Sequence, residues 1–164
     1  MSQSEPIVDS AARRAAAQVL RAFISGRMTN DDFEEQIPLT DDPGIHAVWD
    51  GAWHFYDDMR THKLIGRRKL DTEARRLCVR WLLFLDNNFP YRWPAIAFPA
   101  YDPAVRAEPR RWKRWIDLFA LPPAEAEAFL AAGHYAVWPF NDVREYRHAL
   151  AHPRRLAGFR QVAA

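Results

Sequence analysis

Five residues at four-residue spacing place imidazole and carboxylate side chains along one predicted helix: His46, Asp50, His54, Asp58 and His62. Helical residues four positions apart are neighbours, so each histidine can pair with the adjacent aspartate. Imidazole nitrogen and carboxylate oxygen are also ligands for zinc, iron or manganese. The pattern therefore indicates either a face of ion pairs or part of a metal site.

The helical twist limits how many of the five side chains could share one ion. A helix turns about 100° per residue, so each step of four residues advances about 40°. We therefore predict that only Asp50, His54 and Asp58 could bind one divalent metal. They would need a ligand from another helix, such as Glu34, Glu35, His134 or His148. The favoured alternative has no cofactor and is a solvated face whose ion pairs contribute about 0.2–0.5 kcal/mol each.

Two helices are expected to form the centre of the fold. Residues 43–62 are predicted to be one helix, capped by Asp41 or Asp42, because their other half is apolar. Residues 72–88 form the most apolar predicted helix, which we expect to be buried and to contain Cys78 as a core thiol. The short connection between these helices predicts antiparallel packing.

Shorter helices are predicted on both sides of this pair. Ser10 is expected to cap a helix that ends at Gly26, and Thr29 or Asn30 to cap a second, acidic helix. Residues 88–109 hold five prolines and several aromatic side chains, so we predict a long loop that wraps the helical core. Three further helices are predicted after it, over residues 110–121, 122–133 and 141–152.

These elements predict an all-α, single-domain bundle of six or seven helices. The domain spans residues 10–152, with a flexible tail at 1–9 and a basic tail at 153–164. No apolar run reaches the roughly 18 residues that cross a bilayer, and the start of the chain lacks a signal-peptide pattern. One cysteine and 20 Arg against 3 Lys indicate a cytoplasmic protein from a GC-rich bacterium.

One segment resembles the SHOCT family, a group of short helical domains. Residues 20–37, LRAFISGRMTNDDFEEQI, contain its apolar helix end, glycine, capped acidic helix and Phe33. The resemblance implies a helical corner, with association or nucleic-acid contacts as the family's suggested roles. Over a longer stretch, including DDPGIHAVWDGAWHFYDDMRTH, the chain resembles a small uncharacterised bacterial helical family, which implies no activity.

Charge is unevenly distributed along the chain. Residues 1–62 hold 11 acids and 5 bases, a net charge of −6, whereas residues 63–164 hold 10 acids and 18 bases, a net charge of +8. The two halves either neutralise each other on packing or present a basic surface to an acidic partner. The candidate partner-binding residues are Arg110, Arg111, Lys113 and Arg114, which alternate with tryptophans in RRWKRW.

The leading functional hypothesis is a non-enzymatic interaction protein with a regulatory, immunity-like or accessory role and a protein partner. Its basis is the absence of a recognisable catalytic motif together with aromatic and charged surfaces. One alternative is a metal-dependent enzyme that uses the His/Asp residues. The other is a nucleic-acid-associated factor that uses the arginine-rich segments. The sequence does not determine the oligomeric state.

Overall fold

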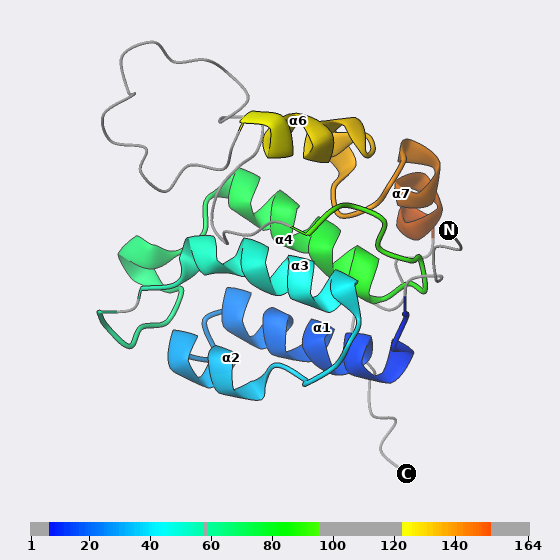
Figure 1. The fold of residues 1–164 in the computed structure, drawn as a ribbon. Helices are drawn as coiled ribbons and strands as arrows, with labels where there is room; N and C mark the ends of the chain where they lie inside the picture. The colour runs from blue at the N-terminus through cyan, green and yellow to red at the C-terminus, as the bar shows by residue number, and fades with distance from the viewer. Residues whose placement is uncertain (1–6, 58, 96–122, 152–164) are drawn as a thin grey trace, which may run out of the picture.

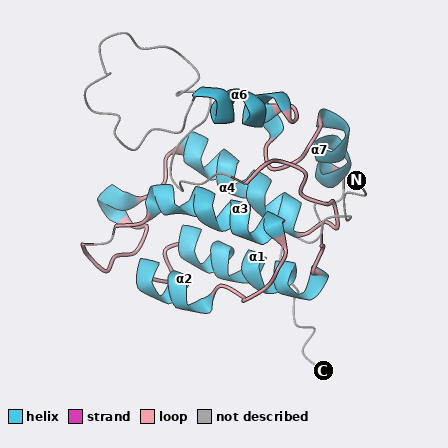
Figure 2. Cartoon of the chain, in the orientation of Figure 1, coloured by secondary structure: helices cyan, strands magenta, loops and turns pink. Residues whose placement is uncertain are grey.

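The computed structural model describes residues 7–57, 59–95 and 123–151 of the chain. Within these ranges the chain contains six α-helices, short 3-10 turns and no strand, so the predicted all-α class is confirmed (Figure 2). The helices are α1 (Ser10–Ile24), α2 (Asn30–Gln36), α3 (Pro43–Ala52), α4 (Thr72–Leu85), α6 (Pro123–Ala131) and α7 (Val143–Leu150). No helix in the described ranges is long and apolar enough to cross a membrane.

Three helices, α1, α3 and α4, form the centre of the bundle (Figure 1). α1 and α3 run in the same direction and α4 runs opposite to both (Figure 1). The antiparallel packing of α3 and α4 is therefore as predicted, although the connection between them, residues 53–71, is longer than expected. α2 packs against α1, whereas α6 and α7 lie on the other side of α4. α4 therefore lies between α1 and α3 on one side and α6 and α7 on the other.

Side-chain caps define where five of the helices begin. The caps are Asp9, Thr29, Asp42, Asp71 and Asp142. Each side chain accepts hydrogen bonds from the first free backbone N–H groups of its helix. Thr29 and Asp42 were each one of two predicted caps, but α1 is capped by Asp9 rather than by the adjacent Ser10.

The core is built on α4, as its apolar sequence predicts. Residues Cys78, Trp81, Leu82, Leu83, Phe84 and Leu85 of α4 are all less than 5% exposed. From the other side, Leu20 and Phe23 of α1 are buried against it. The aromatic packing continues to α2, where Phe33 stacks on Phe23 with ring centroids 4.5 Å apart. These contacts hold α2 on the bundle through one large side chain.

The helix predicted over residues 43–62 is too long. α3 ends at Ala52, a 3-10 turn covers Trp53–Phe55, and Tyr56 has extended backbone angles. Phe55 still packs near Trp81, but Met59, expected on the buried half, is 87% exposed. The backbone after Phe55 instead turns back toward the start of α2, where it finds other hydrogen-bond partners.

The predicted wrapping loop is described only up to residue 95. In that part, Tyr91 and Trp93 are 5% and 4% exposed, so both aromatic side chains are buried as expected. Trp93 packs on Phe129 of α6, with ring centroids 5.0 Å apart. Residues 96–109, the helix predicted over 110–121, residues 1–6 of the first tail and the tail at 153–164 lie outside the described residues.

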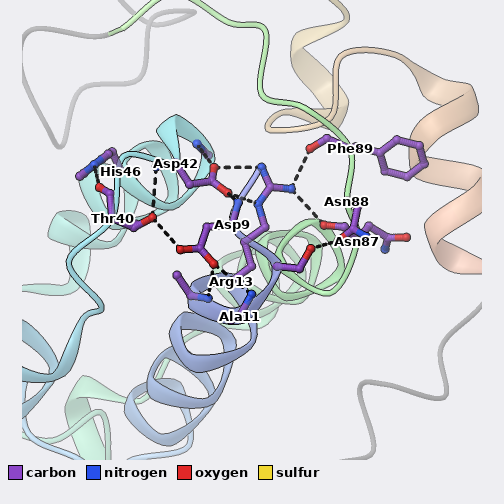
Figure 3. Close-up of polar contacts among 12 residues, drawn as sticks. Asp9, Ala11, Arg13, Thr40, Asp42, His46, Asn87, Asn88 and Phe89 are labelled. Atoms are coloured by element: carbon purple, nitrogen blue, oxygen red, sulfur yellow. Dashed lines mark hydrogen bonds and ion pairs between the residues drawn. The ribbon is translucent and has the colours of Figure 1, made fainter. Parts of the chain in front are cut away.

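A fully buried ion pair, Arg13 with Asp42, connects three parts of the chain (Figure 3). Nε and Nη2 of Arg13 donate to the two carboxylate oxygens of Asp42, at 2.6 and 3.0 Å. Nη1 donates to the carbonyl oxygens of Asn87 and Phe89, at 3.0 and 2.7 Å. One guanidinium group thus fixes α1 to the start of α3 and to the chain after α4.

The carboxylate of Asp42 is equally well satisfied. It also accepts the backbone N–H groups of Asp9, at 3.0 Å, and of Gly44, at 2.8 Å. The Phe84 ring covers the guanidinium of Arg13 at 4.7 Å. A Cβ at position 44 would lie 2.7 Å from Phe84 Cε1 and 2.8 Å from Arg13 Nη2. Glycine at this position therefore permits the close packing of all three groups.

Arg13→Met should lower the free energy of unfolding by about 3–5 kcal/mol, because it leaves the Asp42 carboxylate buried without its counter-charge. The adjacent Arg14 is exposed, so Arg14→Met is the matched control and should have little effect. Urea unfolding followed by circular dichroism measures both. Equal stability of the two variants would contradict a structural role for the pair.

Candidate functional site

The residues of the predicted His/Asp series do not share one helix. His46 and Asp50 lie on α3, and the Nε2 atom of His46 is 2.7 Å from the carbonyl oxygen of Thr40. His62 lies beyond the helix end, in the loop after Tyr56. The five residues therefore do not form the continuous helix face that their spacing predicted.

The metal trio of Asp50, His54 and Asp58 stays a prediction. Asp58 and the side chain of His54 lie outside what the structure describes. Among the described residues, no three or more histidine, cysteine, aspartate or glutamate side chains form a group that could hold a metal ion. Glu34, proposed as a further ligand, instead accepts a hydrogen bond from the Tyr56 hydroxyl at 2.5 Å.

Asp50 is half-buried at the side of α3, and its carboxylate has no hydrogen bond in the described part of the chain. Burial raises the pKa of Asp50 above its ordinary value, and the positive charge of His46 opposes this only in part. A carboxylate in such surroundings weakens a fold when ionised. Residues of this kind are often kept for a function, which makes Asp50 a candidate site residue.

Tyr91 carries the second perturbed group near Asp50. Its hydroxyl is buried and accepts a hydrogen bond from Nε1 of Trp138 at 3.3 Å. Burial raises the pKa of Tyr91 to about 12, and the negative charge of Asp50 adds to this effect. The phenol therefore keeps its proton at neutral pH. This electrostatic influence was not predicted from the sequence, because residues 50 and 91 have no motif in common.

The thiol of Cys78 is not a candidate nucleophile. Cys78 is fully buried in α4, and burial raises the pKa of its thiol to about 12. A thiol that stays protonated is a poor nucleophile. The predicted role as a small core residue therefore fits its surroundings. Asp50 and Tyr91 remain as two groups whose pKa is raised by burial.

A second candidate site is the loop after α3, which Asn30 holds in place. Asn30 is fully buried at the start of α2, and its backbone N–H donates to the carbonyl oxygen of His62 at 3.0 Å. Its Oδ1 accepts the backbone N–H of His62 at 2.6 Å. Its Nδ2 donates to the carbonyl oxygens of Asp57 and Arg60, at 3.2 and 3.3 Å. One side chain thus fixes several points of the loop.

Histidine 62 adds a second restraint from inside the loop. Its two ring nitrogens, Nδ1 and Nε2, lie 3.1 and 3.0 Å from the carbonyl oxygens of Arg60 and Phe55. In the neutral ring only one nitrogen carries a proton, so the ring donates to one carbonyl at a time. In the described structure, His62 therefore connects two points of the loop and is not part of a helix face.

Ion pairs and hydroxyl contacts complete the attachment of the loop. Arg68 donates to the Asp57 carboxylate at 2.8 Å. This bond, together with the backbone N–H of Met59, lowers the pKa of Asp57. The Thr61 hydroxyl donates to the carboxylate of Asp31 in α2. The loop is therefore ordered by contacts at both ends and in its middle.

We define the basic loop as residues 59–69. It contains five basic residues and no acid, and all five are exposed: Arg60, Lys63, Arg67, Arg68 and Lys69. Two large apolar side chains, Met59 and Ile65, are 87% and 59% exposed. Leu64, at 6% exposure, anchors the loop to the core between them. The fold thus holds an ordered loop that exposes apolar and positively charged groups together.

The partner surface was predicted in a different segment of the chain. Arg110, Arg111, Lys113 and Arg114 lie outside the described residues, so that prediction stays open. The basic loop was missed because residues 59–62 were expected to continue a helix. The signal present in the sequence was the run of bases around Gly66.

Comparison with known proteins adds no family. No protein-family model, curated protein or solved structure matches the chain. The resemblance of residues 20–37 to the SHOCT family therefore stays a prediction. The function is therefore inferred from the geometry of the chain itself.

Replacing Asp50 by asparagine should stabilise the protein at pH 7. The folded pKa of Asp50 is raised, so the unfolded chain loses this proton more readily and its ionisation favours unfolding. The penalty is absent below the unfolded pKa, grows between the unfolded and the folded pKa, and is constant above the folded pKa. Thermal unfolding at pH 3 and pH 7 should show a gain only at pH 7. The exposed Asp41→Asn variant controls for the loss of one charge, and an equal gain in both variants would contradict the interpretation.

Removing the Asn30 side chain should loosen the basic loop. Asn30→Ala leaves the backbone groups of Asp57, Arg60 and His62 without buried partners, at a cost of about 1–3 kcal/mol. Trypsin cleavage within the basic loop should then accelerate by roughly ten-fold or more. Gln36→Ala, an exposed change on the same helix, should leave the cleavage rate unchanged. Equal cleavage of both variants would show that Asn30 does not hold the loop.

Proposed function

We propose that this chain is a non-enzymatic interaction protein whose contact surface is the basic loop. The observation that supports the proposal is that Asn30 holds the loop by hydrogen bonds while Met59 and Ile65 stay exposed to solvent. Ordered loops on a rigid scaffold are common binding elements, and large apolar side chains held in solvent mark contact sites. The proposed role is regulatory or accessory, in the bacterial cytoplasm.

A protein partner fits this surface better than nucleic acid. Proteins that bind single strands stack bases on aromatic side chains, and the basic loop contains no phenylalanine, tyrosine or tryptophan. Its exposed large side chains are the aliphatic Met59 and Ile65, which match an apolar protein surface. Exposed acids of α2, Asp32 and Glu35, lie on the neighbouring helix and disfavour a long phosphate backbone.

Photo-crosslinking inside the cells that make the protein tests this function. A photo-reactive amino acid in place of Met59 should yield a protein adduct, because this side chain points into solvent on the proposed surface. The matched control carries the same photo-reactive amino acid in place of Arg147, which is exposed on α7. This control should give far less adduct. The adduct should also disappear when Lys63 and Arg67 are replaced by glutamate.

Two outcomes would overturn the proposal. A nuclease-sensitive adduct at position 59 would assign the basic loop to nucleic acid. Equal adducts at positions 59 and 147 would show that the loop has no special role in contact.

A further inference from the structure

The acidic helix α2 borders the basic loop directly. The Asp31 carboxylate accepts the Thr61 hydroxyl, and Asn30 bonds His62 through both its backbone and its side chain. The pKa of Asp32 is lowered by hydrogen bonds from Thr29 and by the positive charge of Lys63. A strongly acidic helix and a strongly basic loop are therefore adjacent at one end of the bundle (Figure 1).

Most of these charges are not neutralised within the molecule. In the described part of the chain, four exposed cations of the basic loop have no ion-pair partner: Arg60, Lys63, Arg67 and Lys69. On α2, the exposed carboxylate of Glu35 is also without an ion pair in those residues. The two adjacent surfaces thus present opposite charges to solvent.

This arrangement restricts the chemistry of the partner. A purely acidic partner is attracted by the basic loop but repelled by α2, and a purely basic partner meets the reverse. A partner must therefore carry both signs of charge in the opposite order. A surface with adjacent positive and negative patches meets that condition against a copy of itself rotated about a two-fold axis.

We propose that α2 and the basic loop bind the same surface of a second copy of this chain. In this two-fold dimer, each basic loop lies on α2 of the other copy, and Met59 and Ile65 provide the apolar contact. The inference rests on the proposed contact function of the basic loop and names its partner.

Charge exchange between two variants tests the dimer. One variant, Lys63→Glu with Arg67→Glu, lowers the charge of the basic loop from +5 to +1, and the other, Glu35→Lys with Gln36→Lys, reduces the charge of α2 from −4 to −1. None of these four side chains has a hydrogen bond or ion pair in the described structure, so both variants should fold. Sedimentation equilibrium at low salt should give the wild-type chain twice its mass of 19.1 kDa. Each variant alone should dimerise at least ten-fold more weakly.

Mixing the two variants should give a dimer tighter than that of either variant alone, because the unchanged basic loop of one variant then lies on the unchanged α2 of the other. Arg147→Glu, an exposed change on α7, is the control and should dimerise like the wild-type chain. Rising salt should weaken the wild-type dimer, because the contact charges are exposed before association. Thermal unfolding of every variant separates loss of contact from loss of fold.

Three results would overturn the inference: a monomeric wild-type chain at low salt, a dimer that persists in both variants, or a mixture that stays monomeric. The proposed function is tested separately. An adduct at position 59 with a different protein would keep that function and reject the dimer. Failure of the crosslink at position 59 would reject the contact function itself.

Discussion

The fold depends on one charge that must be neutralised inside the core. The Arg13 guanidinium is buried without access to water, and such a group is tolerated only when its N–H groups meet acceptors of matched geometry. The acceptors come from Asp42 and from two carbonyl oxygens after α4. Because these acceptors belong to different elements, satisfying one side chain sets the relative positions of three helices.

The bundle therefore has two ends with different constructions. The end at Arg13 is dry, densely packed and closed by Phe84 and Gly44. The opposite end, at the start of α2, exposes charged and apolar side chains on a backbone that Asn30 holds in place. The exposed groups of the second end are therefore available for contacts with another molecule.

The sequence was sufficient for the parts of the fold that depend on local chemistry. Capping residues marked where most helices begin, and the apolar pattern of α4 identified the central helix. The end of α3 was missed because the apolar pattern continues through Tyr56, whereas the backbone is redirected by hydrogen bonds to Asn30. That competition involves a residue far away in the sequence, and periodicity does not register it.

The same limit applies to the candidate sites. Arg13 has the charged side chain of a surface residue, but its position lies on the buried face of α1 with Ala16 and Leu20. Its pairing with Asp42, 29 positions later, satisfies this charge in the core. The raised pKa of Tyr91 likewise depends on its burial and on Asp50, neither of which is visible in a motif. Spacing placed Asp50 in a series of His and Asp residues, but it could not show that the carboxylate is half-buried rather than part of a solvated face.

The contacts of Arg13 also bear on how the chain folds while it is synthesised. Its carbonyl partners at Asn87 and Phe89 follow it by 74 and 76 residues. Until those residues have left the ribosome, α1 can form as a helix but its guanidinium cannot be fully satisfied in a dry core. Contacts of such long sequence separation slow folding. The core of the first half of the chain can therefore close only after α4 has been synthesised. Until then its apolar side chains stay exposed, and exposed apolar surface favours aggregation.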